Sequence, residues 1–274
     1  MPNVPCEQVE GHGGASLAEP GEQDGERAGH GREAVRERAG EPAAGDRPLD
    51  NPAWWSLNGG HARFAERRGR VVRYPVDVAP FLALPDEPAQ EDWDDLAALA
   101  GPGAQVVIPG LRSEPPRGWE VVMRLPGVQL TGEDVAGAYD GELVRLGPGD
   151  VPEMLDLVSR TEPGPYLPRT IEMGAYLGVR HDGRLVAMAG ERLRPPGWTE
   201  ISAVCTDPAF RGRGLASRLV LAVAAGIRER GETPFLHTVA TNATAIRLYE
   251  FLGFRLRRQV MFAAVRVPAG TPVG

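Results

Sequence analysis

The chain has 274 residues, with 30 basic residues, all of them Arg, against 37 acidic ones, so its net charge is −7. Two cysteines are too few for a disulfide framework or a four-cysteine zinc site, and no apolar run approaches the roughly 20 residues of a membrane span. The N-terminus also lacks the basic and then apolar segments of a secretory signal. Composition therefore excludes a membrane protein, a disulfide scaffold and a basic nucleic-acid coat, and we expect a globular cytoplasmic protein that binds neither nucleic acid nor membrane.

The two ends of the chain differ in composition from the rest. Residues 1–50 hold 11 acidic side chains and 5 Arg, and they contain no aromatic residue. Such a segment cannot bury enough apolar surface to offset the entropy of ordering. We therefore predict a disordered tail over 1–48 and a disordered C-terminus over 268–274.

A first set of elements follows the predicted tail. Asn51-Pro52 is typical of a helix start, with Asn51 as the cap and proline in the first turn. The pattern then predicts a strand at 71–76, a helix at 92–99 and strands at 105–109 and 119–125. Together they indicate a small α+β unit over 49–135, in which no cluster of His, Cys or acidic residues suggests chemistry.

A second set of elements covers residues 140–267. A strand at 143–146 precedes a helix at 151–159 that we expect Asp150 to cap. The turn Asp182-Gly183 predicts a hairpin. Its strands lie at 174–180 and 184–189, and the later elements are a strand at 198–206, a helix at 214–230, a strand at 235–239, a helix at 242–252 and a strand at 254–267.

A glycine-rich loop joins the strand at 198–206 to the long helix. Its two glycines allow close backbone approach to a ligand, and the helix N-terminus adds unsatisfied N–H groups and partial positive charge. The chain has no lysine, which excludes a Walker loop. We therefore predict a pyrophosphate cradle formed by Arg211, Gly212, Arg213, Gly214, Leu215 and Ala216.

The second strand-to-helix junction carries polar and aromatic residues at helical spacing. Asn242, Ala245 and Tyr249 fall on one face of the helix at 242–252. Taken alone, Asn242 is a plain N-cap and Tyr249 a core aromatic residue. The two junctions together allow a more specific interpretation.

In their order and separation, these junctions resemble those of the GNAT superfamily of acyl-CoA-dependent N-acetyltransferases. Arg211-Gly212-Arg213-Gly214-Leu215-Ala216 matches the family's Gln/Arg-x-x-Gly-x-Gly/Ala motif, and Asn242, Ala245, Tyr249, Gly253 and Phe254 match its later helix. The stretches 187–193 and 200–206 resemble the FR47-like branch. The resemblance implies an α+β GNAT fold with a mixed, mostly antiparallel twisted sheet flanked by helices, and Asp50-Asn51-Pro52 resembles the start of a degenerate N-terminal GNAT-like unit.

The resemblance also implies an activity and its residues. It implies acetyl-CoA as co-substrate, no metal, and acetyl transfer to a primary amine by direct attack in a ternary complex. The expected cofactor-binding residues are Val204, Cys205, Thr206, the loop 211–216, Asn242, Ala245 and Tyr249. A backbone N–H of Val204 or Cys205 is expected to bind the oxyanion, and Tyr249 to act as general acid.

The amine must lose a proton before it attacks, because an alkyl ammonium has a pKa of about 10.4. Glu200 is the first candidate base, with Glu191 and His237 as alternatives, and a paired surface carboxylate or a substrate anchor is an equally good interpretation of Glu200. Strand alternation predicts that Glu200, Ser202 and Val204 share one face. Cys205 is expected to serve in packing rather than as a nucleophile.

Two further questions stay open at the level of sequence. The loop alone is equally compatible with a non-catalytic acyl-CoA-binding regulator, and the acceptor can be a small molecule or a peptide amine. We expect the 49–135 unit, which lacks a phosphate loop, not to bind acetyl-CoA and either to close one side of the acceptor cleft or to serve as a packing partner.

Overall fold

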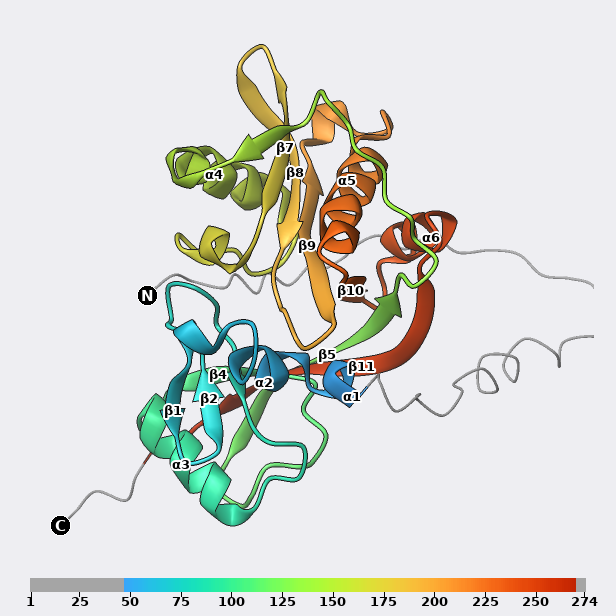
Figure 1. The fold of residues 1–274 in the computed structure, drawn as a ribbon. Coiled ribbons are helices and arrows are strands. Elements are labelled where there is room, and N and C mark those ends of the chain that lie inside the picture. Colours follow the sequence, from blue (N-terminus) through green and yellow to red (C-terminus); the bar gives the residue numbers. More distant parts are fainter. Residues whose placement is uncertain (1–46, 270–274) are drawn as a thin grey trace, which may run out of the picture. The chain divides into compact units, whose positions relative to one another are not determined.

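The computed structural model describes residues 47–269, and its main sheet has eight strands in the order β4-β11-β5-β10-β9-β8-β7-β6 (Figure 1). Neighbouring strands are antiparallel except β9 and β10, which are parallel. The predicted mixed, mostly antiparallel sheet is therefore confirmed. Its strands are β4 (Gln105–Pro109), β5 (Glu120–Thr131), β6 (Val144–Leu146), β7 (Tyr176–His181), β8 (Arg184–Glu191), β9 (Trp198–Thr206), β10 (Thr233–Val239) and β11 (Arg255–Arg266).

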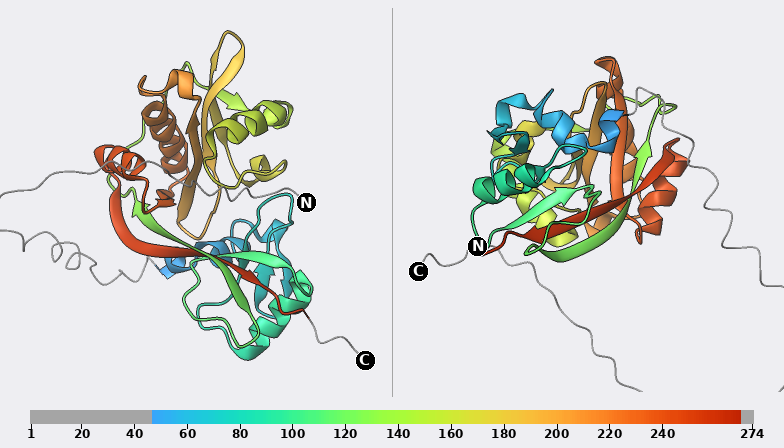
Figure 2. Two further views of the ribbon diagram at one scale, coloured as in Figure 1. Left: turned by 180° about the vertical axis from the view of Figure 1, so that it is seen from behind. Right: turned by 90° about the horizontal axis from the view of Figure 1, so that it is seen from below.

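Helices cover both faces of this sheet (Figures 1 and 2). On one face, α5 (Leu215–Glu229) packs its stripe of Leu219, Val223 and Ile227 against Ile201 and Leu236, and α6 (Ala243–Phe251) adds Tyr249 to the same cluster. On the other face, α4 (Val151–Thr161) buries Met154 and Leu157 against Met188 and Cys205. Leu219, Val223 and Ile227 recur at every fourth position, and this spacing in the sequence predicts one buried face of the helix.

The first 60 described residues build smaller elements. A three-stranded antiparallel sheet has the order β1-β2-β3. The elements are α1 (Arg47–Asp50), α2 (Pro52–Leu57), η1 (Ala62–Phe64), β1 (Glu66–Arg68), β2 (Val71–Arg73), β3 (Leu82–Ala83) and α3 (Gln90–Ala100), and the later 3-10 turns are η2 (Pro148–Asp150), η3 (Thr170–Met173) and η4 (Pro208–Phe210). Of the tails predicted at 1–48 and 268–274, residues 1–46 and 270–274 lie outside the described residues, whereas Arg47 and Pro48 belong to α1.

Strand β5 links the two predicted units. It lies between β10 and β11 and pairs with both, so the sheet continues across the boundary predicted at 135–140. The division into 49–135 and 140–267 stays a prediction. The expected strand at 119–125 is too short, because Pro126-Gly127 resembles a strand end. Gly127 instead lies within the strand, where an added Cβ would come 2.4 Å from the Phe262 ring.

A β-bulge interrupts β9 beside its partner β8. The pairing register shifts between Met188 and Gly190, and Ala203 has a φ of +52°. Val204 therefore packs with the α5 cluster, whereas Ala203 and Cys205 pack with the α4 cluster. The expected alternation was wrong beyond Ser202: Val204 does not share a face with Glu200, because the extra residue reverses the order of faces.

All three predicted N-cap residues occupy N-cap positions, but two of them do not cap the helix through their side chains. The Asn51 side chain donates to the Leu84 carbonyl, and Asp150 accepts from the Gly147 amide, so neither caps the helix that follows. Asn242 does cap α6, because its Oδ1 accepts a hydrogen bond from the Ala245 amide at 3.1 Å.

Candidate active site

The parallel strands β9 and β10 separate within the sheet. Their pairing runs from Thr233 opposite Trp198 to Leu236 opposite Ile201 and ends there, while β10 stays paired with β5 as far as Val239. The last residues of β9 and β10 therefore enclose a wedge, and the bulge at Ala203 lies on its β9 side. Such an opening exposes backbone groups that a closed sheet would use for pairing.

The glycine-rich loop follows directly from β9. Gly212 and Gly214 have φ values of +75° and +73°, which glycine adopts without strain, and a Cβ on either would meet no atom within 4 Å. The open side of the loop thus leads into α5, whose first amides have no intrahelical acceptor. Within residues 47–269, Arg211 and Arg213 form no ion pair; their guanidinium groups donate only to the Thr206 and Ala209 carbonyls.

These residues suit an anionic ligand such as a pyrophosphate group. The loop combines open glycine backbone, a helix N-terminus and two guanidinium groups not committed to carboxylates. At the end of β9, the buried Thr206 Oγ1 has no hydrogen-bond partner among the described residues. Each of these groups is a donor that a bound anion or thioester would satisfy.

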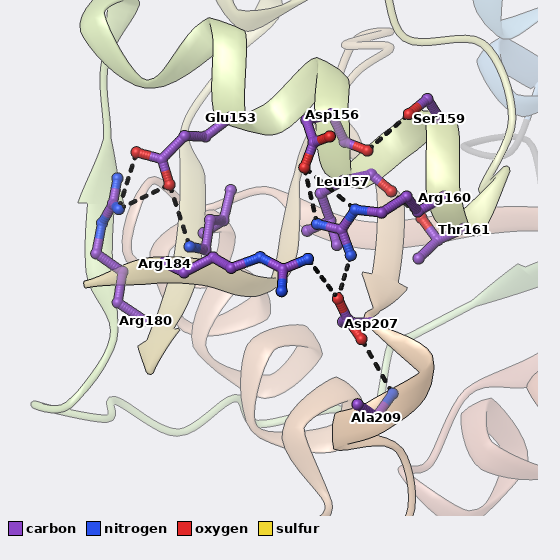
Figure 3. Close-up of polar contacts among 11 residues, drawn as sticks. Glu153, Asp156, Leu157, Ser159, Arg160, Thr161, Arg180, Arg184, Asp207 and Ala209 are labelled. Atoms are coloured by element: carbon purple, nitrogen blue, oxygen red, sulfur yellow. Dashed lines mark hydrogen bonds and ion pairs between the residues drawn. The ribbon is translucent and has the colours of Figure 1, made fainter. Parts of the chain in front are cut away.

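A polar network fixes the start of this loop (Figure 3). Asp207 accepts from the Ala209 amide at 3.0 Å and from the guanidinium groups of Arg160 on α4 and Arg184 on β8. The Ala209 amide and the two arginines hold the pKa of Asp207 below its ordinary value. The carboxylate therefore ties the end of β9 to α4 and β8.

Glu200 lies in β9 just before the wedge and is fully buried. Its two oxygens accept hydrogen bonds from Arg192 at 2.8 Å each, and Oε1 also lies 2.7 Å from Nδ1 of His237. Burial alone would raise the pKa of Glu200, but Arg192 and His237 hold it well below its usual range. A carboxylate so stabilised is a weak proton acceptor, and its geometry is that of a residue that orients His237.

The other candidates differ in their surroundings. Glu191 is buried and pairs with Arg230 at 2.9 Å. Tyr249 is buried edge-to-face with Phe254, and burial raises the pKa of its hydroxyl to about 12. Burial also raises the pKa of Cys205 to about 11, so its thiol stays protonated at neutral pH and is a poor nucleophile.

The acid and base candidates reach the wedge from opposite faces of the sheet. Tyr249 packs with Ile201 and Leu236, the chain neighbours of Glu200 and His237. Because successive side chains of a strand alternate, Glu200 and His237 point to the other face. The structure therefore brings Glu200 and His237 together and places Tyr249 across the sheet from them.

Sequence reasoning missed three partners of this site. Arg192 follows the predicted end of its strand, Gln129 lies beyond the predicted end of β5, and Asp50 was noted only as part of a helix start. An amide between the apolar Val128 and Leu130 was an available signal for Gln129. No local signal pairs Arg192 with Glu200, because the pairing depends on the β8–β9 register.

The described part of the chain has neither a candidate metal site nor a candidate membrane span. No group of three or more His, Cys, Asp and Glu residues there could hold a metal ion. No helix within residues 47–269 has the length and apolar character needed to cross a membrane.

A parallel strand pair that opens beside a glycine-rich helix start is the architecture expected of the GNAT class of acyltransferases. The FR47-like protein model matches residues 176–263. A crystal structure of a putative acetyltransferase from the GNAT family of Novosphingobium aromaticivorans is 42% identical, with a TM-score of 0.73, over 80% of this chain and 97% of that one. The chain belongs to the GNAT family and to its FR47-like branch.

Two curated relatives match a shorter segment. The N-alpha-acetyltransferase RimI of Mycobacterium tuberculosis is 37% identical over 95 residues, and the mycothiol acetyltransferase of Thermomonospora curvata is 37% identical over 82 residues. The matches cover 31% and 30% of this chain, and 56% and 27% of the respective relatives. Less than two thirds of either relative is therefore represented here.

Proposed function

We propose that the protein transfers the acetyl group of acetyl-CoA to a primary amine by direct attack in a ternary complex. The observation that carries this proposal is the wedge between β9 and β10, which leads into the open glycine loop at the start of α5. The names of the relatives, all acetyltransferases, point to the same chemistry.

Several residues would hold the co-substrate. The backbone of the loop 211–216, with Arg211 and Arg213, would bind the pyrophosphate, and Asn242 and Ala245, at the start of α6 shortly after β10, would contact another part of the co-substrate. When bound, acetyl-CoA supplies an activated thioester. The amide of Val204 or Cys205, beside the β9 bulge, donates to the oxyanion that forms on its carbonyl, and Thr206 offers a further hydroxyl.

Tyr249 assists the departure of the CoA thiolate. Its hydroxyl stays protonated at neutral pH because burial raises its pKa to about 12. A thiol has a parent pKa of about 8.5, so complete proton transfer from this hydroxyl to the thiolate is uphill. Tyr249 therefore stabilises the departing sulfur mainly as a hydrogen-bond donor, which is general-acid assistance with incomplete transfer.

Binding is tested with a matched pair of glycine variants of the full chain. Gly212 and Gly183 both have left-handed φ values and open space beside them, so glutamate at either position costs similar backbone strain. Gly212→Glu places a carboxylate in the proposed cradle and should raise the Kd for acetyl-CoA at least about tenfold, because like charges repel. Gly183→Glu, in the β7–β8 turn, should leave the Kd unchanged.

Turnover is tested by release of the CoA thiol with a panel of amines, amino acids and peptides. Tyr249→Phe should lower kcat and leave the Kd for acetyl-CoA within about twofold, because the hydroxyl acts on the leaving group. Binding without release by any acceptor would favour the acyl-CoA-binding regulator instead. Equal weakening of binding by both glycine variants would contradict the proposed cradle.

A further inference from the structure

A cavity opens on the face of the sheet that carries Glu200 and His237. It encloses about 20 Å³ that water can occupy, and about 370 Å³ when the space open to solvent in front of it is counted. One wall comes from the segment around α1 and α2, and the opposite wall from β11. Its lining includes Leu49, Phe81, Gln129, Arg192, His237 and Phe262.

His237 connects this cavity to the wedge. It is the first residue of β10 beyond the last β9–β10 pair, Leu236 with Ile201, so it lies where the strands separate. Its side chain is 7% exposed and forms part of the cavity lining. The His237 side chain therefore lies between the cavity and the wedge in which we place the thioester.

The neighbours of His237 determine where its ring carries a proton. The ionised Glu200 carboxylate can only accept, so Nδ1 of His237, 2.7 Å away, is the donor. Gln129 is oriented by its other bonds: its amide nitrogen donates to the Leu49 carbonyl at 2.8 Å, and its oxygen accepts from Arg257 at 2.8 Å. Gln129 therefore donates its second hydrogen to Nε2 of His237 at 3.0 Å, and Nε2 carries a lone pair.

We propose that this cavity receives the acceptor amine and that Nε2 of His237 takes its proton, with Glu200 as the residue that positions the imidazole. The inference rests on the proposed acetyl transfer and deepens it. The N–H bond of the ammonium breaks as an Nε2–H bond forms, and Gln129 gives up its hydrogen bond to Nε2. The freed lone pair attacks the thioester carbonyl, and the C–S bond breaks while the departing thiolate accepts a hydrogen bond from Tyr249. The second excess proton of the nitrogen then passes to the thiolate through solvent, so that a neutral amide and the CoA thiol are released.

Electrostatics supports this division of roles. The imidazolium that forms lies against the Glu200 carboxylate, which compensates its charge. Glu200 stays ionised because Arg192 holds it with two hydrogen bonds. In this arrangement a buried carboxylate, Glu200, orients the imidazole that acts as the base, His237.

The cavity wall indicates the chemical class of the acceptor. Its polar side chains are already paired: Asp50 with Arg257 and Arg258, Arg192 with Glu200, and Gln129 with its three partners. What remains for a ligand is the apolar surface of Leu49, Phe81 and Phe262. The acceptor is therefore a small primary amine with an apolar group, and a polyamine, whose further charges would find no free carboxylate there, is disfavoured.

The test compares two acceptors with the same ring in the full-length chain. Benzylamine is protonated at neutral pH and needs a base, whereas aniline is already a free amine. His237→Gln should lower kcat/KM for benzylamine at pH 7 by about a hundredfold or more and change the value for aniline less than about threefold. In the variant, the benzylamine rate should rise about tenfold per pH unit, following the free amine.

Each outcome is decisive. An equal loss for both acceptors, or none for benzylamine, overturns His237 as the base even though transfer occurs. Wild-type preference for spermidine over benzylamine overturns the assigned acceptor class. Release of no thiol with any amine, while acetyl-CoA still binds, refutes the proposed function itself. Thermal melting of the variant checks that it folds.

Discussion

At the scale of single residues, buried charges and buried imidazoles dominate the behaviour of this protein. Arg192 and Glu200 lie side by side in the interior, and each satisfies the other's hydrogen-bonding capacity. His61 is fully buried as well, between the Tyr74 hydroxyl at 2.9 Å and the Met173 carbonyl at 3.0 Å. The free energy of unfolding therefore depends on the charge pair of Arg192 and Glu200 and on the protonation of His61, and variants measure the two contributions separately.

Replacing Glu200 should destabilise the fold strongly. Glu200→Gln leaves the Arg192 guanidinium buried without a counter-charge, and breaking a buried pair on one side typically costs about 3–5 kcal/mol. Urea unfolding at neutral pH measures the loss. The double variant Arg192→Met with Glu200→Leu should recover most of it, because no charge is then left buried. A loss below about 1 kcal/mol for the single variant would contradict the pairing.

His61 should make stability fall between neutral and mildly acidic pH. Burial lowers the pKa of His61 from 6.5 to about 4, so between these values the unfolded chain binds a proton that the folded chain does not. The contribution is complete above pH 6.5 and decreases as the pH falls to about 4, by about 3 kcal/mol in total.

The measurement is the free energy of unfolding at pH 7, 6, 5 and 4. In His61→Asn the part of the slope that arises from His61 should vanish, although the variant is less stable at pH 7. His181→Asn, at an exposed histidine, should keep the wild-type slope. A wild-type stability that does not change between pH 7 and 5 would rule out the assignment.

At the scale of elements, the β9 bulge determines which side chains reach the wedge. Ala203 adopts a left-handed conformation that L-residues with branched Cβ atoms strongly disfavour. The bulge inserts one residue opposite β8 and turns Val204 toward α5. As a result, the even-numbered Val204 after the bulge lies on the α5 face of the sheet, whereas the even-numbered Glu200 before it lies on the opposite face.

A valine at this position tests the bulge. Although valine favours strands, Ala203→Val should destabilise the protein by about 2 kcal/mol, because the left-handed region crowds a β-branched side chain. Ser202→Val, one residue earlier at an ordinary φ, should change stability much less. Denaturant unfolding compares the two, and a stabilising Ala203→Val would show that β9 is regular.

The elements also show how far the sequence alone leads. Strand β9 and the hairpin of β7 and β8 follow from alternation and turn chemistry, and α5 follows from its apolar stripe. The bulge in β9 and residues 126–131 of β5 could not be predicted, because both depend on close packing with other strands. The loop at 211–216 was predictable from local motif and charge. The Glu200–His237 contact was not, because it requires the β9–β10 register.

At the scale of the whole molecule, residues 47–135 and 136–269 share one sheet. Strand β5 supplies the neighbour of both β10 and β11, and Phe235 of β10 packs with α1 and α2 residues such as Leu49 and Leu57. The cavity described above likewise has walls from both segments. Removal of the first segment, which contains β4 and β5, would therefore leave β11 without either neighbour, expose one edge of β10 and open the cavity.

Fragment complementation tests this dependence. Residues 136–274 alone should lack a cooperative unfolding transition, because β10 and β11 lose the strand between them. Co-expression with residues 47–135 should restore a soluble complex with near-native circular dichroism. A folded and active 136–274 fragment would show that the first segment is dispensable.

The position of β5 has a consequence for how the protein forms during synthesis. About a hundred residues separate the end of β5 from the start of β10, and more precede β11, so β5 emerges from the ribosome long before either partner exists. Its edges must stay unpaired until β10 and β11 have been synthesised. Completion of the sheet, and of the cavity lined by Gln129, His237 and Phe262, therefore waits for β11.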